Sequence, residues 1–273
     1  MSQSVTGNDT DASRGIGRTE DGMARIVIIG DVGGCADQLS QALTSTQDDP
    51  DAVVVQVGDL IDRGLDSAGV LAIVRQRLEG PQRWIQLVGN HESQYLGAEM
   101  FWPQRLPDED AALLRSWWLR DRLRVAAAVR TADGEELLIT HAGLTVDAWR
   151  KLGEPVTAAT TADLLNTRPE DILWHERGPV WAEAGPDLYD SWLHAADPPP
   201  FGQVHGHSTI VDFRRRAWRC GERVRQRAVV DWEARHTYTR ISTSRFIGID
   251  PQHGRDGAPQ WSPLVFDDAT VLT

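Results

Sequence analysis

Three apolar, β-branched runs, each ending in a polar segment that contains glycine, restrict the fold of this chain more than any other feature. The runs are RIVIIG from Arg25, AVVVQV from Ala52 and WIQLV from Trp84. Helical periodicity over residues 36–46 and 66–78 separates them. The order strand, helix, strand, helix, strand predicts a βαβαβ unit, which forms a parallel sheet covered by helices.

Polar residues follow each predicted strand directly, in the segments GDVGG (30–34), GDLIDRG (58–64) and GNHE (89–92). The carboxyl ends of parallel strands meet at one edge of a sheet, and ligands bind outside that edge. We therefore expect these three segments to converge on one site.

The rest of the chain predicts more helices and a second sheet. Residues 92–124 are expected to form helices inserted after the third strand. A β-hairpin follows, with strands RVAAAVR and ELLIT and with Asp133 and Gly134 in its turn. A helical stretch reaches about Thr167, and from Phe201 onward short strands alternate with turns, which predicts a mixed or antiparallel sheet.

The chain shows no internal repeat and no linker, so residues 24–273 are expected to form a single domain. Residues 1–23 are rich in Ser, Thr, Gly and Asp and have no hydrophobic period. This composition predicts a disordered N-terminal tail. Met23 stands just before the first strand and could be the actual start of the protein.

Composition narrows the class of protein. With 273 residues, 41% of them apolar, the chain can bury a sizeable core. It has no run of about 20 apolar residues and no signal segment, so neither a membrane span nor export is expected. Cys35 and Cys220 are its two cysteines and stand far apart, which favours a reducing, cytoplasmic setting over a disulfide framework or a thiolate zinc site.

The net charge of −12 disfavours nucleic acid as a partner, because an acidic surface repels a phosphate backbone. Any substrate that carries phosphate would need local positive charge. Bound metal ions would supply that charge.

The polar residues predicted at strand ends supply carboxylate and amide oxygens, imidazoles and a guanidinium. They are Asp31, Asp59, Asp62, Arg63, Asn90, His91, His141 and His207. Hard oxygen donors together with imidazoles suit divalent cations, and a guanidinium forms bidentate hydrogen bonds with phosphate. This set of groups is typical of a two-metal site that hydrolyses phosphoesters.

Five motifs resemble those of the calcineurin-like metallophosphoesterases in their order and in their spacing. The resemblance is to the bacterial branch of phosphoprotein phosphatases and diadenosine tetraphosphatases in particular. The five motifs are GDVGG, GDLIDRG and GNHE, followed by THAG (140–143) and HGHS (205–208). The resemblance extends over roughly residues 25–267. It implies an α/β fold, a sandwich of two mixed β-sheets flanked by helices, with the site at the carboxyl ends of the strands.

By that resemblance the metal ligands are Asp31, Asp59, Asn90, His141 and His207, with Asp59 bridging two cations. His91 resembles the general acid and Asp62 the carboxylate that orients it. Arg63, and less directly Arg177, resemble phosphate contacts. The implied reaction is attack by a metal-bridging hydroxide on a phosphomonoester such as protein phosphoserine or phosphothreonine, or on a dinucleoside polyphosphate.

Gly33 departs from the family pattern, which has a metal-binding histidine at this position. The first metal would then keep Asp31 and Asp59 but lose an imidazole, so an oxygen-rich site that prefers Mn²⁺ or Mg²⁺ over Zn²⁺ is expected. His205, which lies on the same face as His207 if that segment is a strand, or His253 could replace the missing ligand. The alternative function is a degenerate phosphatase that binds a phosphorylated ligand without hydrolysing it.

Competing interpretations fail on spacing. A cysteine phosphatase needs Arg six residues after its Cys, but Gln41 and Gln226 occupy those positions. A dinucleotide-binding GxGxxG motif would need glycine at Val32.

For Arg177 a solvated surface charge remains an equal alternative. The tryptophans at 102, 117 and 118 are expected to pack in the core, and the histidines at 175, 194 and 236 to be structural or exposed.

Overall fold

The structure is a computed structural model that describes residues 22–46, 49–252 and 260–272. The predicted tail, residues 1–23, therefore lies almost wholly outside the described residues, as does His253. None of the helices in the described ranges has the length and the apolar run that a membrane crossing requires.

Short strands and helices alternate along the first half of the chain. They are β1 (Ala24–Ile29), α1 (Ala36–Leu43), the 3₁₀ turn η1 (Thr44–Thr46), β2 (Val53–Gln56), α2 (Ser67–Glu79), β3 (Arg83–Leu87), α3 (Asn90–Ser93), α4 (Asp108–Leu119), β4 (Leu123–Arg124), β5 (Ala126–Arg130) and β6 (Glu136–Thr140). The predicted βαβαβ unit is confirmed, because β1, β2 and β3 pair in parallel. The predicted hairpin is the antiparallel pair β5–β6.

The second half begins with helices and ends with strands. Its elements are α5 (Val146–Lys151), α6 (Ala158–Asn166), α7 (Glu170–Leu173), the π-helical turn η2 (Ala184–Tyr189), α8 (Asp190–His194), β7 (Gly202–His205), β8 (Val211–Asp212), β9 (Ala217–Trp218), α9 (Glu222–Arg225), β10 (Ala228–Asp231), β11 (His236–Ile241), β12 (Ser244–Gly248) and β13 (Leu264–Val271). The strands expected after residue 201 are present, and they form a mixed arrangement because β7 runs parallel to both β6 and β12.

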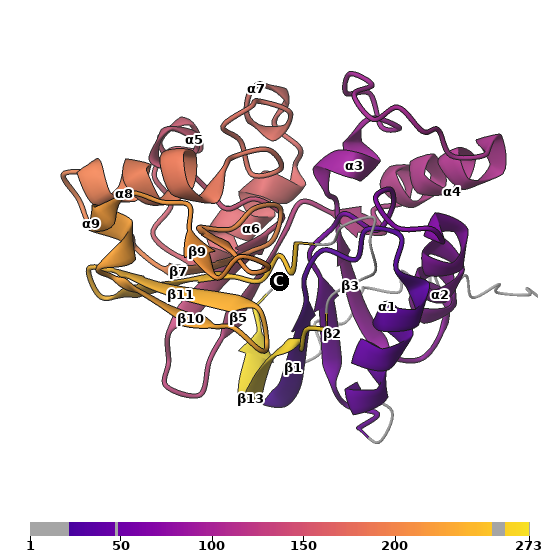
Figure 1. The fold of residues 1–273 in the computed structure, drawn as a ribbon, viewed down its shortest axis with the longest axis horizontal. Coiled ribbons are helices and arrows are strands. Elements are labelled where there is room, and N and C mark those ends of the chain that lie inside the picture. Colours follow the sequence, from indigo (N-terminus) through magenta and orange to yellow (C-terminus); the bar gives the residue numbers. More distant parts are fainter. Residues whose placement is uncertain (1–21, 47–48, 253–259, 273) are drawn as a thin grey trace, which may run out of the picture.

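Strand β13 joins the two halves of the sheet. The strand order is β10-β11-β12-β7-β6-β5-β13-β1-β2-β3-β4, and β13 is antiparallel to both β1 and β5. The sequence predicted two sheets packed against each other. The structure has that layered arrangement, but hydrogen bonding through β13 makes the two sheets one continuous ladder (Figure 1).

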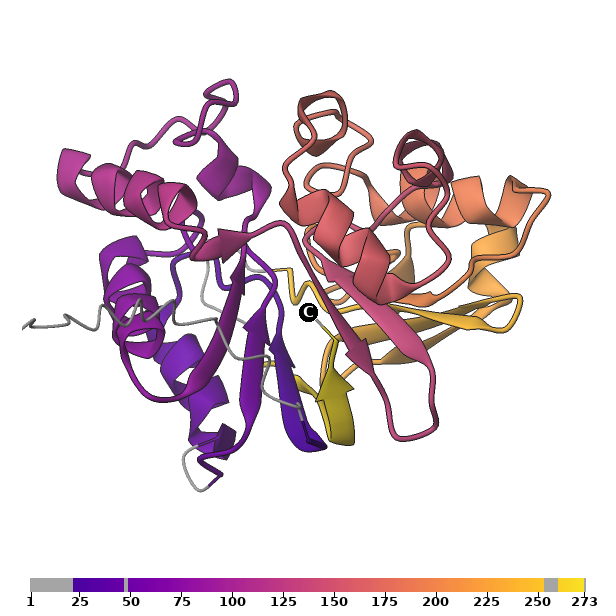
Figure 2. The same cartoon turned by 180° about the vertical axis from the view of Figure 1, so that it is seen from behind.

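The core has three apolar layers. The middle layer lies between the two halves of the sheet and contains Ile26 and Ile28 of β1 together with Ile139 of β6 and Val204 of β7. A second layer packs α1, α2 and α4 against the β1–β3 half, and a third packs α5, α6 and α8 against the other half. Figures 1 and 2 show these two groups of helices at opposite ends of the molecule. This is the predicted sandwich flanked by helices.

The helices bury the apolar side chains that their periodicity predicts. In α1 the buried residues are Leu39, Ala42 and Leu43, all on the side that faces the sheet core. Trp117 of α4 is buried in the same layer, as expected for a packing residue. The helices thereby cover the outer faces and leave the carboxyl ends of β1, β2 and β3 for the polar segments.

Candidate active site

The loop after β2 has an unusual backbone. Asp59, Asp62 and Arg63 have φ angles of 53°, 69° and 60°, in the left-handed region that non-glycine residues seldom adopt. Each such residue costs on the order of 1–3 kcal/mol, and such residues cluster at functional sites. The loop therefore needs external bonds to hold its shape.

Glu92 supplies those bonds. One of its carboxylate oxygens accepts the backbone N–H of Asp59 at 2.8 Å and of Gly89 at 2.9 Å, and the other accepts that of Leu60 at 2.8 Å. Glu92 is fully buried. The motif GNHE contains this glutamate, but the motif alone predicted no role for it. Its position in the motif was the available signal.

Four predicted metal ligands converge beside this loop. The Oδ1 of Asn90 lies 3.0 Å from Nε2 of His141 and 3.0 Å from Nδ1 of His207, and Asp59 Oδ1 lies 3.3 Å from the same His141 nitrogen. Ligand atoms of Asp59, His141 and His207 all lie within 4.8 Å of one another. The structure therefore brings together residues that are far apart in the sequence.

The hydrogen bonds around these side chains fit a cation. The Nδ1 of His141 lies 2.9 Å from the carbonyl of Val57, which can only accept, so Nδ1 carries the proton and Nε2 presents a lone pair. Burial lowers the pKa of His141 and keeps the ring neutral. The His141 lone pair therefore faces the oxygens of Asp59 and Asn90, and a divalent cation satisfies such a set of acceptors.

The surroundings of the Asn90 amide also indicate a cation at this point. Turned by half a rotation, it would place its nitrogen 3.0 Å from both imidazole nitrogens and 3.1 and 3.3 Å from the two Asp59 oxygens. A donor fits there because all of these neighbours can act as acceptors. A metal ion at this point would bind the amide oxygen together with them.

The first predicted ligand, Asp31, is not part of the group of ligand atoms formed by Asp59, His141 and His207. It is 1% exposed, and its Oδ1 accepts the backbone N–H of His207 at 2.9 Å. Burial, followed by the charges of Asp250 and Asp59, raises the pKa of Asp31 well above its usual value. Asp250 is 4% exposed and was missed by sequence analysis. It follows the apolar end of a strand, as the other site residues do, and that signal could have found it.

The pKa of Asp59 is shifted in the opposite direction to that of Asp31. Burial would raise its pKa, but His141, His91 and Arg63 more than offset burial and hold the pKa below its usual value. The Asp59 carboxylate is thus charged among groups that favour its charge.

His91 and Asp62 form the predicted proton-donor pair. The Nδ1 of His91 lies 2.6 Å from Asp62 Oδ2, and Gln94 donates its side-chain amide to the same oxygen at 3.1 Å. Burial lowers the pKa of His91, but Asp59 and the bond to Asp62 raise it by more. The other ring nitrogen, Nε2, lies 3.8 Å from Asp59 Oδ2 and faces the site.

Arg63 lies where two cavities of about 510 Å³ each meet, since it lines both of them. One of its nitrogens lies 3.6 Å from Asp59 Oδ2 and 3.4 Å from Nε2 of His91. One cavity also contains Asp62 and Arg105, and the other contains His207. A guanidinium in this position can hold an oxyanion beside both the donor pair and the metal ligands.

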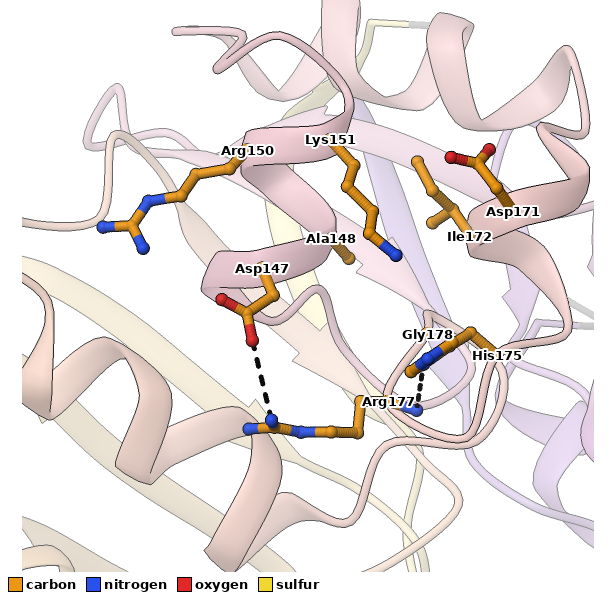
Figure 3. A pocket seen from close by; sticks show the side chains of 9 residues that line it. All are labelled: Asp147, Ala148, Arg150, Lys151, Asp171, Ile172, His175, Arg177 and Gly178. Carbon is orange, nitrogen blue, oxygen red and sulfur yellow. Dashed lines mark hydrogen bonds and ion pairs between the residues drawn. The ribbon is translucent and has the colours of Figure 1, made fainter.

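Arg177 lies in a separate cavity of about 350 Å³ (Figure 3). Its guanidinium lies 3.5 Å from Asp147 of α5 and 3.2 Å from Asp187 of η2. Within the described part of the chain its ion pairs are with these two acids. The predicted phosphate contact therefore stays a prediction, and the structure does not bring Arg177 into the cluster around Asp59.

Two expectations were wrong. His205 does not share a face with His207, because His207 has a φ of 61° and leaves the strand, and Nε2 of His205 lies 2.7 Å from the hydroxyl of Tyr189. His205 therefore does not replace the missing ligand. Trp102 does not pack in a helix core, because its ring lies 4.8 Å from that of His91 and lines the cavity beside Arg63.

A family model described as calcineurin-like phosphoesterase matches residues 24–236. The chain belongs to this family. The resemblance stated from the five motifs is confirmed by this match, which spans all of them.

Curated relatives match only parts of the chain. A serine/threonine-protein phosphatase 1 of Salmonella typhimurium is 42% identical over 73 residues, which are 26% of this chain and 31% of the relative. A symmetrical bis(5'-nucleosyl)-tetraphosphatase of Photorhabdus laumondii is 34% identical over 128 residues, 43% of this chain and 44% of the relative. The chain therefore spans less than half the length of either relative.

Solved structures are more distant in sequence. A cold-active protein tyrosine phosphatase is 17% identical, with a TM-score of 0.48 over 85% of this chain and 72% of that one. A metallophosphoesterase from Sphaerobacter thermophilus is 17% identical, with a TM-score of 0.42 over 91% and 87% of the two chains.

Proposed function

We propose that this protein is a hydrolase of phosphoesters that depends on two divalent cations. The ligands we assign to them are Asp31, Asp59, Asn90, His141 and His207, with Asp59 shared. When bound, the two cations would supply an activated water and offset the negative charge of the phosphoryl group. The remaining chemistry belongs to side chains of the protein.

His91 is the proton donor in this proposal. Its Nδ1–H is held by Asp62, so Nε2 is the atom that carries the mobile proton toward the leaving oxygen. Arg63 stabilises the equatorial phosphoryl oxygens by charge-assisted hydrogen bonds. The rings of Phe101 and Trp102 lie against His91, with centroids 5.1 and 4.8 Å away, and limit its contact with water.

One observation carries this proposal. The hydrogen-bonded pair His91–Asp62 lies directly beside the proposed metal ligands, with 3.8 Å between His91 Nε2 and Asp59 Oδ2. A module that only binds phosphorylated ligands needs a charged cradle but no oriented proton donor. The arrangement thus favours hydrolysis over the degenerate, binding-only alternative.

The test is hydrolysis of p-nitrophenyl phosphate by protein that has been stripped with a chelator and reloaded with Mn²⁺, Mg²⁺, Zn²⁺ or Ni²⁺. We expect turnover with at least one ion and none without. His91→Asn should lower kcat by about 10²- to 10⁴-fold while the metal content, measured by elemental analysis, stays unchanged. Absence of turnover with every ion would overturn the proposal and favour the binding-only alternative.

The substrate, the preferred metal ion and the cellular location are also proposals. The names of the two curated relatives suggest a phosphorylated protein or a dinucleoside polyphosphate as substrate. We propose Mn²⁺ as the preferred ion, because Asp31 and Asp59 offer only oxygen. The cytoplasmic location expected from the free thiols of Cys35 and Cys220 stays a prediction.

A further inference from the structure

A chain of four rings crosses the proposed site. The ring of Phe101 lies 5.1 Å from that of His91 and 5.0 Å from that of Trp181, and the ring of Trp181 lies 6.4 Å from that of His207. These distances join ring centroids, and each pair is edge-to-face, the usual geometry of packed aromatic rings. Phe101 lies between α3 and α4 and Trp181 between α7 and η2, in opposite halves of the molecule (Figure 1). The rings therefore connect the proposed proton donor to a proposed metal ligand.

Hydrogen bonds fix the segment that carries Phe101 relative to the proton donor. The backbone N–H of the next residue, Trp102, donates to the side-chain oxygen of Gln94 at 3.3 Å. The amide of Gln94 donates in turn to Asp62 Oδ2 at 3.1 Å, the same oxygen that lies 2.6 Å from Nδ1 of His91. The position of Phe101 is thus tied to that of the His91–Asp62 pair.

Phe101 keeps much of its surface in contact with water. It is 42% exposed, whereas the His91 side chain on which it packs is buried. A single exposed apolar side chain is common on protein surfaces, but this one lies against a proton donor. Trp102 lines the cavity of about 510 Å³ that also contains Arg63 and Asp62. The aromatic surface therefore adjoins the place proposed for the phosphoryl group.

The position of His91 indicates which part of a substrate would meet these rings. In the proposed reaction Nε2 of His91 gives its proton to the leaving oxygen, which must then lie about 2.6–3.2 Å from that nitrogen. The leaving group begins one bond beyond this oxygen, in the surroundings of His91 that Phe101 and Trp102 form. An aryl ring bonded directly to the oxygen would reach Phe101. The base of a nucleotide is separated from its phosphoryl group by the whole ribose.

We propose that Phe101, together with Trp102 and Trp181, binds the aromatic leaving group of an aryl phosphomonoester, the class of compound that includes phosphotyrosine. This inference rests on the proposed function and adds the class of substrate to it. Contacts between rings favour an aryl group over an alkyl group of similar size, because they add to the burial of apolar surface. Water attacks phosphorus, the bond from phosphorus to the aryl oxygen breaks with its electron pair on that oxygen, and His91 protonates it. The products are a phenol and inorganic phosphate.

The first test measures binding without hydrolysis. Phenylphosphonate and cyclohexylphosphonate each carry a six-carbon ring on a P–C bond that this reaction does not break. Calorimetry gives the Kd of each for Mn²⁺-loaded protein, and we expect the wild type to prefer the phenyl compound at least about threefold. Phe101→Leu should bring the ratio of the two Kd values to within about twofold of one, and Phe101→Tyr, which keeps a ring, should retain the preference. Phe266→Leu is the matched control, because it makes the same change on β13, opposite Ile26, and should retain the wild-type ratio.

Equal affinity of the wild type for the two phosphonates would overturn the proposal, as would no binding of either or a phenyl preference that survives in Phe101→Leu. If Phe101→Leu does not fold by circular dichroism, Trp181→Leu takes its place and should lower the preference at least about twofold.

The second test separates an aryl group from a nucleobase. In Phe101→Leu, kcat/KM for O-phosphotyrosine should fall at least about threefold more than kcat/KM for AMP. The reverse order would mean that Phe101 contacts a base, and it would overturn the proposal. A protein that prefers phenylphosphonate but hydrolyses nothing would refute the proposed function and leave the aromatic binding site standing, whereas hydrolysis without a phenyl preference would do the opposite.

Discussion

The two halves of the buried cluster around Asp59 differ in chemistry. One half offers the amide and imidazole groups of Asn90, His141 and His207, and the other offers the carboxylate of Asp31, with Asp250 on the adjoining backbone segment. Burial lowers the pKa of His207 to about 4, so its imidazole is neutral at pH 7, whereas Asp31 and Asp250 contribute only oxygen atoms. The cluster thus has a nitrogen-containing half and an oxygen-only half.

The halves also differ in how the fold supports them. His141 is fixed by a hydrogen bond from its own ring to Val57, which orients the nitrogen that faces the cluster. The oxygen-only half depends on close backbone approaches, because a Cβ at Gly206 would lie 2.1 Å from Asp31 Oδ1. His141 is thus oriented by a hydrogen bond from its own side chain, whereas Asp31 is held by the backbone N–H of His207 and by the close approach of Gly206. Different substitutions should therefore disable each half.

The largest effect is expected where the halves meet. Asp59→Ala removes the shared carboxylate, so both ions should be lost and turnover of p-nitrophenyl phosphate should fall by at least about 10³-fold. Elemental analysis and the kinetic assay measure the two effects. Glu79→Ala, an exposed residue paired with Arg75, is the control and should change neither. One tightly retained ion in Asp59→Ala would show that the carboxylate is not shared.

Removal of metal should distinguish the two halves of the cluster by their affinity for Zn²⁺. A chelator titration of Zn²⁺-loaded protein should release ions in two steps, the first from the oxygen-only half, because imidazole ligands retain Zn²⁺ better than carboxylates do. In His141→Ala the slower step should disappear, with affinity lowered at least about tenfold. Zinc release followed with a chromophoric chelator measures both steps. A single step in the wild type would contradict the difference between the halves.

Packing at the oxygen-only half gives a smaller effect. Gly206→Ala forces a side chain against Asp31 and should destabilise the protein by about 1–3 kcal/mol, which lowers Tm by several degrees. Gly221→Ala is the matched control, because a Cβ there meets nothing within 4 Å, and its effect should stay within about 0.5 kcal/mol. Thermal unfolding measures both. Equal Tm values for the two variants would mean that the close approach at Gly206 is not needed.

The smallest effect is expected outside the cluster. Arg177→Gln breaks partly exposed ion pairs with Asp147 and Asp187, and such pairs contribute about 0–1 kcal/mol. KM for p-nitrophenyl phosphate should change less than about twofold, whereas Arg63→Ala should raise it at least tenfold. If both variants raise KM equally, Arg177 contacts phosphate as the motif resemblance implies.

The sequence predicted the nitrogen-containing half better than the oxygen-only half, and the reason is physical. Asp59, Asn90 and His91 follow apolar strands whose parallel pairing can be read from periodicity, so their convergence on one edge follows from the fold. His141 follows a strand of the predicted hairpin. Asp250 follows β12, whose place beside β7 depends on pairing between segments about 40 residues apart. No local pattern specifies such a pairing.

Two other site residues depend on tertiary contacts that spacing does not encode. Glu92 accepts hydrogen bonds from the backbones of two different loops. The residue type in a motif does not predict which N–H groups donate to its carboxylate. Trp102 packs on His91 because the segment between α3 and α4 turns back over the site, and apolar content alone predicted a core position for it. Both contacts follow from the tertiary structure.

The position of β13 has a consequence for biosynthesis. Both of its neighbours, β1 and β5, are made long before it, and β13 follows every other described strand in the chain. A nascent polypeptide on the ribosome therefore exposes two unpaired edges in its middle until residues 264–271 emerge. We expect chaperone dependence to be concentrated in that interval of translation.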